Sequence, residues 1–193
     1  PKIHKTPVLG RPIVGAVKWI TTPYSIILDE LLKPAIMELK HIIKDVHSLT
    51  YDILNSNLNY IEGDILCTMD VASLYTNISV EKLIQKIHHI NPIFAELTNI
   101  IIKNNFFTYN NETYHQLDGI AMGTNAAVSL ANIYLNELDI LINKNSKIIY
   151  YKRYIDDIVL LYRGNLNELN SEHSKWNQLI PKIKLDIKTS SEC

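Results

Sequence analysis

Hydrophobic residues recur along this chain at two spacings, and each spacing predicts a different kind of element. Spacings of three and four residues predict helices over residues 25–54, 79–89, 93–104, 124–141 and 165–179. Short apolar runs, some alternating with polar residues, predict strands over residues 64–70, 106–109, 113–116, 148–154, 158–162 and 183–187. This order predicts the α+β class, with a mainly antiparallel sheet backed by helices.

Turn and capping residues refine several of these boundaries. Ser79 is expected to cap the helix that follows it, and the pair Asn110-Asn111 is expected to turn a hairpin. Pro34 should break or kink the first helical run early. Residues 1–23 are rich in Pro and Gly and should form extended segments and turns.

Charge is distributed unevenly along the chain. The formal net charge is only −1, but residues 1–28 hold no acid. Between Asp139 and Asp156 the charged residues are all basic, namely Lys144, Lys147, Lys152 and Arg153. A polyanion could lie against either stretch, and a plain solvated basic surface is the alternative.

Composition limits the class of protein. The 193 residues are 47% hydrophobic, enough for one sizeable core or one domain with a small attached lobe. The two cysteines form neither a disulfide framework nor a zinc spacing, which favours an intracellular protein, and Cys67 is expected in the core. No apolar run reaches the roughly 18 residues of a membrane span. Because the chain begins with Pro, we expect an excerpt of a longer polypeptide.

Acidic residues stand at the ends of two predicted strands. Asp156 and Asp157 join two apolar runs, and Asp70 ends the run at residues 65–69. Each position alone is also typical of an ordinary turn. Together, in this order and with a Gly-containing loop between them, they predict a site for nucleotidyl transfer. In that chemistry two Mg²⁺ ions about 3.5–4 Å apart act on the attacking and leaving oxygens, and Mg²⁺ prefers hard carboxylate ligands.

At these positions the chain resembles the reverse transcriptase family, most closely its Penelope-like retroelement branch, which is related to telomerase. The motifs that carry the resemblance are residues 68–78 (TMDVASLYTNI), 119–124 (GIAMGT) and 153–157 (RYIDD). Upstream, residues 1–5 (PKIHK) and 11–14 (RPIV) are similar to two fingers motifs of the same branch. The resemblance implies an RNA-directed DNA polymerase that adds deoxynucleotides to a primer 3′-OH. For a retroelement enzyme, a nuclear location is expected within the cell.

The resemblance also implies roles for the acidic residues. Asp70 and Asp156 would bind both Mg²⁺ ions, for which Mn²⁺ is the expected substitute. The Val71 carbonyl would be an added ligand, and Asp157 would be the third acid, with a smaller part in metal binding.

Nucleotide contacts follow from the same motifs. Arg11 would contact the incoming triphosphate, because a guanidinium matches phosphate oxygens, with Lys2 and Lys5 as further candidates. Tyr75 stands where the family carries an aromatic residue that clashes with a ribose 2′-OH, so it favours DNA synthesis. A core tyrosine is the alternative.

The loop at residues 119–124 would flank the nascent base pair, since glycines let the backbone approach closely. Met122 and Gly123 would therefore contact the nucleotide. Gln116, Gly119 and Tyr154 would contact template or primer, and Gln116 is equally well explained as a plain loop residue.

The resemblance predicts a domain plan and partners. Residues 1–60 would form partial fingers and the connection to the palm, and residues 61–193 the palm, with a fingers-like helical insertion at about 79–116. The partners would be an RNA template, a DNA primer and deoxynucleotides, with no membrane. We expect a thumb, and an endonuclease domain, in a longer parent protein. Two alternatives stay open: an RNA-dependent RNA polymerase, which Tyr75 disfavours, and a non-catalytic palm that serves as an RNA-binding scaffold.

Overall fold

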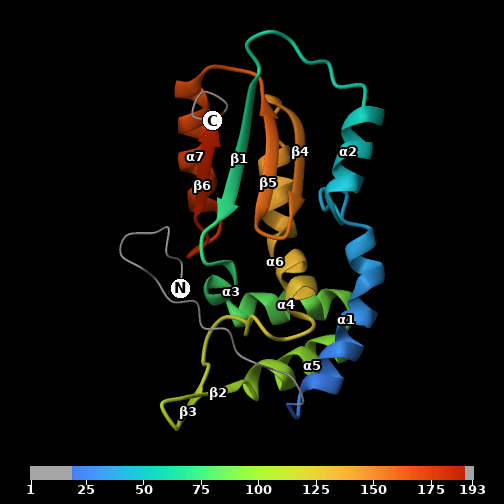
Figure 1. Ribbon diagram of the computed structural model, residues 1–193, viewed down its shortest axis with the longest axis vertical. Helices are drawn as coiled ribbons and strands as arrows, with labels where there is room; N and C mark the ends of the chain where they lie inside the picture. The colour runs from blue at the N-terminus through green and yellow to red at the C-terminus, as the bar shows by residue number, and fades with distance from the viewer. Residues whose placement is uncertain (1–18, 190–193) are drawn as a thin grey trace.

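A four-stranded antiparallel sheet forms the centre of the molecule, in a computed structural model that describes residues 19–189 (Figure 1). The spatial order of its strands is β4 (Ile148–Tyr154), β5 (Asp157–Tyr162), β1 (Ile65–Val71) and β6 (Leu185–Thr189). In this order β5 and β6, which come late in the chain, flank β1 on its two sides. The predicted mainly antiparallel sheet with helical backing is therefore confirmed.

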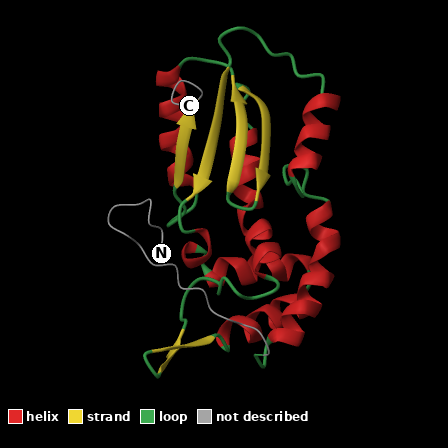
Figure 2. Ribbon diagram, in the orientation of Figure 1, coloured by secondary structure: helices red, strands yellow, loops and turns green. Residues whose placement is uncertain are grey.

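The two faces of the sheet differ in burial. Along β1, Cys67, Met69 and Val71 are buried, whereas Thr68 and Asp70 on the opposite face are more exposed. The buried face packs on α6 (Ala127–Asn143) and α7 (Leu166–Leu179), as Figure 2 shows. Among residues 19–189, no helix lies over β1 on the other face, so strand-end side chains there are accessible (Figure 2).

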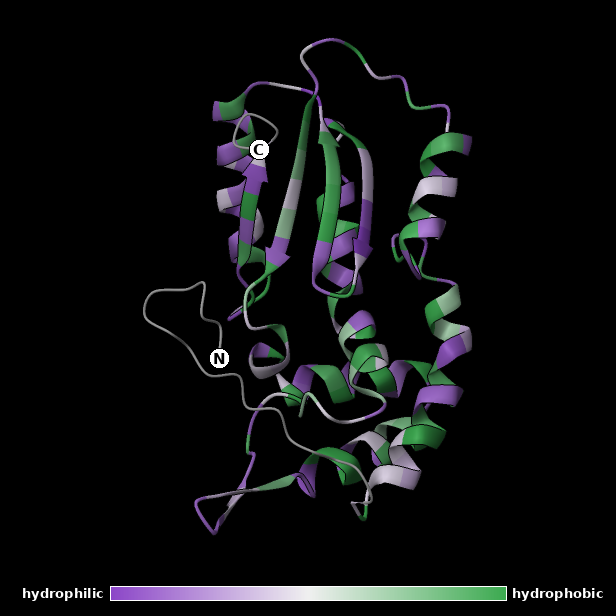
Figure 3. Ribbon diagram, in the orientation of Figure 1, coloured by the Kyte–Doolittle hydropathy of each residue, from purple (hydrophilic) through white to green (hydrophobic). Residues whose placement is uncertain are grey.

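Helix α6 supplies much of the core. Leu130, Leu135 and Leu138 are fully buried on it, and each contributes about 1.5–3 kcal/mol by leaving water. Figure 3 shows the apolar character of β5 and α6 in green and the hydrophilic end of β4 in purple. Apolar burial along one helix and one sheet face therefore fixes how the two layers meet.

The remaining elements lie beside and beyond the end of the sheet. They are α1 (Thr22–Met37), α2 (Val46–Asn55), α3 (Leu74–Asn77), α4 (Val80–Ile90), α5 (Pro92–Lys103), β2 (Phe106–Tyr109) and β3 (Glu112–His115). Helices α4 and α5 pack on each other and lie with the β2–β3 hairpin beyond one end of the sheet (Figure 1). The assignment of residues 79–116 as a fingers-like insertion stays a prediction. No helix within residues 19–189 is long and apolar enough to cross a membrane.

Local signals placed several boundaries correctly. The Ser79 side chain accepts a hydrogen bond from the Lys82 N–H, and Asn165 and Glu168 form a reciprocal capping box at the start of α7. Asn110 and Asn111 have φ of 50° and 61°, the left-handed values that a two-residue hairpin turn requires.

Other boundaries were wrong, each for a physical reason. The helical run predicted over residues 25–54 is two helices, because α1 ends at Met37, three residues after Pro34, and α2 begins only at Val46. The early break expected from Pro34 is present, but the run was expected to continue as helix to residue 54. Helix α6 begins at Ala127 rather than residue 124, since the N–H groups of Thr124 and Ala127 bond carbonyls three residues back in tight turns. Strand β6 begins at Leu185 rather than residue 183, because the Ile183 N–H closes a turn onto the Ile180 carbonyl.

Candidate functional site

The three predicted acids gather at one end of the sheet. Asp70 and Asp157 are direct partners across the β1–β5 ladder, and Asp156 lies in the two-residue turn between β4 and β5. The Val71 N–H donates to the Asp156 carbonyl oxygen at 2.9 Å, which ties this turn to β1. Residues 86 positions apart in the chain therefore share one strand end.

Pairing in the sheet decides which way these side chains point. Directly opposed residues of antiparallel strands lie on the same face, about 4.5–5.5 Å apart at Cα. Asp70 faces away from the helices, as the burial of Met69 and Val71 on either side of it indicates. Asp157 shares that face, and so does Asp186 of β6, the partner of Asp70 on its other side. Asp186 was not identified from the sequence, because nothing local marks it.

Like charges oppose one another at this strand end. Burial and the negative charges of Asp156 and Asp70 raise the pKa of Asp157. Within residues 19–189, none of the three carboxylates takes part in a salt bridge. The cluster therefore favours a bound cation, which would relieve the repulsion.

The loop after β3 packs against the segment that follows Asp70. The Ile120 N–H donates to the Tyr75 carbonyl oxygen at 2.8 Å. Gly119 has φ +74°, and a Cβ there would lie 2.5 Å from the same oxygen. Burial and the charge of Asp156 raise the pKa of Tyr75. Tyr75 is thus held between the glycine loop and the acids, and the three motifs meet at one place.

The family assignment follows from comparison with known proteins. The family model described as reverse transcriptase (RNA-dependent DNA polymerase) matches residues 3–190. The chain belongs to the reverse transcriptase family. No curated protein matches the sequence. The closer resemblance to the Penelope-like branch stays a prediction.

Solved structures share the fold of this reverse transcriptase domain. Telomerase from Candida albicans, in complex with the TWJ fragment of telomeric RNA, matches with a TM-score of 0.65 and 11% identity over 90% of this chain and 36% of that chain. Apo telomerase from Candida tropicalis matches with a TM-score of 0.66 and 10% identity over 90% of this chain and 37% of that chain. BmCPV RNA-dependent RNA polymerase at elongation state matches with a TM-score of 0.59 and 10% identity over 88% of this chain and 18% of that chain. At identities this low, the three likenesses show the fold alone, that of a polymerase palm. The chain spans about a third of the telomerase chains.

The donor set of the reverse transcriptase site suits a hard divalent cation. Asp70, Asp156 and Asp157 offer carboxylate oxygens, which Mg²⁺ prefers over nitrogen or sulfur ligands. Within residues 19–189, no three acidic, histidine or cysteine side chains are grouped closely enough to hold a metal ion as they stand. The chemical type of the ligands fits the predicted ion, and their roles stay predictions.

Other predicted site residues are placed less decisively. Tyr154 ends β4 and is exposed beside Asp157, its partner across the ladder. Met122 and Gly123 are half-buried in the loop before α6. The Gln116 amide is engaged within the chain, since it accepts from Asn105 and donates to the Asp118 carbonyl. Lys2, Lys5 and Arg11 lie outside the described residues.

Three of the four basic residues in the second basic stretch pair with acids. Arg153 is fully buried and paired with Asp139, Lys152 pairs with Asp52, and Lys147 pairs with Glu168. The expectation that a polyanion lies against this stretch is therefore wrong for Arg153. Acids distant in the sequence neutralise these charges, which the local charge pattern does not reveal. The available signal was the position of Asp139 on the same helix face as Leu135 and Ile142, four residues before it and three after it, which are buried.

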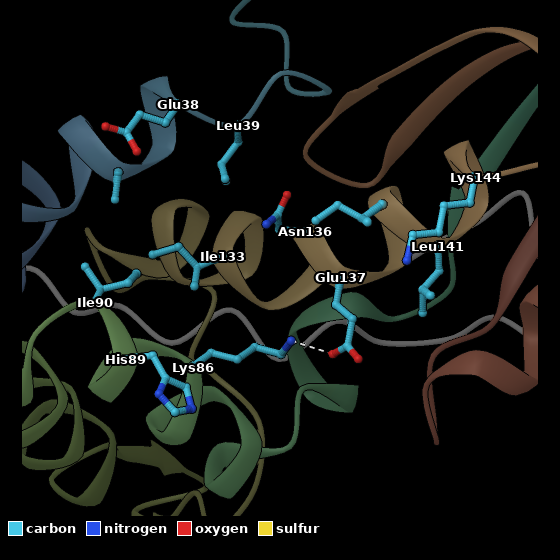
Figure 4. A pocket seen from close by; sticks show the side chains of 12 residues that line it. Glu38, Leu39, Lys86, His89, Ile90, Ile133, Asn136, Glu137, Leu141 and Lys144 are labelled. Atoms are coloured by element: carbon cyan, nitrogen blue, oxygen red, sulfur yellow. Dashed lines mark hydrogen bonds and ion pairs between the residues drawn. The ribbon is translucent and has the colours of Figure 1, made fainter.

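A hollow of about 550 Å³ lies on a different side of α6 from the acids. Figure 4 shows Glu38, which follows the end of α1, Lys86 of α4 and Glu137 of α6 among its lining residues, and an ion pair of 2.6 Å joins the last two. None of the three site carboxylates lines it. It therefore plays no part in the candidate site.

Proposed function

We propose that this chain carries the active site of an RNA-directed DNA polymerase, which transfers deoxynucleotides to a primer 3′-OH on an RNA template. The observation that supports it most is the joining of Asp70, Asp156 and Asp157 at one strand end without a counter-cation among residues 19–189. Membership of the reverse transcriptase family supports the reaction class. The telomerase and viral polymerase likenesses support the fold on which the site is built.

In this proposal the acids hold two divalent cations. The metals would neutralise charge on the attacking and leaving oxygens of the in-line displacement. Asp70 and Asp156 would supply the bridging carboxylates, the Val71 carbonyl a further oxygen, and Asp157 an adjacent acid. The raised pKa of Asp157 supports this arrangement, because a cation would favour its ionised form.

Tyr75 would select the sugar. Its ring is half-buried and packs against the core, while its hydroxyl lies within the electrostatic reach of Asp156. A rigid aromatic edge beside the metal site would clash with a ribose 2′-OH. The glycine loop at residues 119–124 would flank the base pair, and the hydrogen bond from the Ile120 N–H to the Tyr75 carbonyl would hold the tyrosine in place.

The direct test is Mg²⁺-dependent extension of a DNA primer on an RNA template with deoxynucleotides. The wild-type chain is expected to extend the primer, and Asp156→Asn is expected to abolish extension, because an amide cannot replace the negative oxygen. Glu62→Gln is the control, since it removes an exposed acid that precedes the other end of β1. Equal extension by Asp156→Asn and wild type would contradict the proposal.

An RNA-dependent RNA polymerase is the second candidate, favoured by the fold shared with the BmCPV enzyme. Substituting ribonucleotides for deoxynucleotides in the same assay separates the two. Preferential ribonucleotide incorporation would replace the first proposal by the second.

A further inference from the structure

Arg153 is fully buried beneath the strand end that carries the acids, and all five of its guanidinium N–H groups have acceptors. Nε and one terminal nitrogen donate to the two carboxylate oxygens of Asp139 at 2.8 and 2.7 Å. That terminal nitrogen also donates to the Asn132 carbonyl at 3.4 Å. The other terminal nitrogen donates to the Asn132 side-chain oxygen at 2.8 Å and to the Ile155 carbonyl at 2.7 Å.

The acceptors belong to two separate parts of the molecule. Asn132 and Asp139 lie two turns apart on α6, behind the sheet. The Ile155 carbonyl belongs to the turn that carries Asp156. Arg153 therefore links the rigid core helix to the turn, and the Tyr151 hydroxyl fixes Asp139 from the same strand at 2.7 Å.

This turn needs an external restraint. Ile155 has φ +56°, at the first central position of a two-residue hairpin turn, where glycine is the usual residue. A β-branched side chain is strained at such a φ, and strained residues persist only where their surroundings hold them. The hydrogen bond from Arg153 supplies that hold on one side, and the Val71 N–H to Asp156 carbonyl bond supplies it on the other.

Burying an ion pair gives little net stability, because desolvating both charges offsets their attraction. The complete set of acceptors around the five N–H groups of Arg153 therefore indicates that this residue fixes the geometry of the 155–156 turn. We propose that Arg153 and Asp139 are positioning residues that hold the 155–156 turn so that Asp156 faces Asp70. This inference rests on the proposed function for its catalytic meaning, but the hold on the turn is measurable without it.

The test removes the buried network as a unit. The variant Arg153→Met/Asp139→Leu/Tyr151→Phe replaces every charged member by an apolar residue, so no charge is left buried alone. The control is Lys152→Met/Asp52→Leu/Tyr150→Phe. It removes the matching network on the other face of the same strand, where Lys152 and the Tyr150 hydroxyl meet Asp52.

The readout is hydrogen exchange at the Val71 amide, followed by NMR in metal-free protein. Val71 is expected to exchange at least tenfold faster in the Arg153 variant than in wild type, with the other β1 amides unchanged. In the control variant Val71 should stay within threefold of wild type. Wild-type protection of Val71 in a folded Arg153 variant would overturn the proposal. If the triple variant does not fold, Arg153→Lys decides by the same measurement. A lysine ammonium keeps the positive charge but cannot donate to Asp139 and the Ile155 carbonyl in the planar arrangement of the guanidinium.

A second readout connects the turn to metal. Mn²⁺ binding, followed by electron paramagnetic resonance, is expected to weaken at least tenfold in the Arg153 variant and to stay unchanged in the control. Unchanged Mn²⁺ affinity would overturn the positioning role. The two proposals can fail separately. If Val71 exchanges faster in the Arg153 variant but the wild-type chain extends no primer, the proposed function is contradicted and the inference about the turn stands.

Discussion

Replacing Gly119 with alanine would test whether the glycine loop holds Tyr75 by direct contact. The added Cβ would lie 2.5 Å from the Tyr75 carbonyl oxygen, 2.8 Å from Thr76 Cα and 3.0 Å from the Thr76 carbonyl oxygen. All three neighbours are backbone atoms, so no side chain can rotate away. The residue also has φ +74°, which alanine adopts only with strain.

Gly63 provides a matched control. It has φ +95°, but a Cβ there would meet nothing within 4 Å. Gly63→Ala should therefore cost only the conformational strain, about 1–2 kcal/mol. Gly119→Ala should cost the same plus about 1–3 kcal/mol for the overpacked contact, or about 2–5 kcal/mol in all. The difference between the two variants isolates the steric part.

Urea unfolding measures both free energies, and primer extension measures the consequence for Tyr75. The methyl group added at residue 119 should displace the Tyr75 backbone. Gly119→Ala should therefore also raise the ratio of ribonucleotide to deoxynucleotide incorporation, whereas Gly63→Ala should leave this ratio unchanged. Free energies of unfolding that agree within about 0.5 kcal/mol for the two variants would refute the steric argument.

Three further expectations follow from single residues. Tyr75→Val should raise the ratio of ribonucleotide to deoxynucleotide incorporation, and an unchanged ratio would assign the ring to the core alone. The pKa of Asp157 is raised, so its ionised form is disfavoured in the folded chain and metal-free stability falls as pH rises through that pKa. Asp157→Asn should therefore raise the thermal midpoint at pH 7 in chelator, with no gain below about pH 4. Burial raises the pKa of the Cys67 thiol to about 12, so in a Cys193→Ser background it should resist thiol reagents at pH 8 until urea is added.

Most elements could be predicted from the sequence, because their signals are local. Helical spacing, the Ser79 cap and the Asn110-Asn111 turn depend on residues a few positions apart, and the structure has each of them. The short helix α3 (Leu74–Asn77) and the late start of α6 were missed. There, backbone bonds to distant or tightly turned segments outweigh local preference.

The candidate site was predicted in part. The positions of Asp70, Asp156 and Asp157 at strand ends, and the resemblance of their motifs, were available from the sequence. Asp186 was missed because its place beside Asp70 depends on which strand pairs with β1. The same dependence explains why Arg153 was taken for a surface charge, although Asp139 neutralises it inside the core.

The sequence by itself determined where helices and strands form and which residue types stand at their ends, since periodicity and turn chemistry act over a few residues. Only the tertiary structure decided that β5 and β6 flank β1, and therefore that acids far apart in the chain share one face. It also decided the partners of the charges on β4. Arg153 pairs with Asp139, 14 residues away, and Lys152 pairs with Asp52, 100 residues away, and their neighbours in the chain carry no information about this packing.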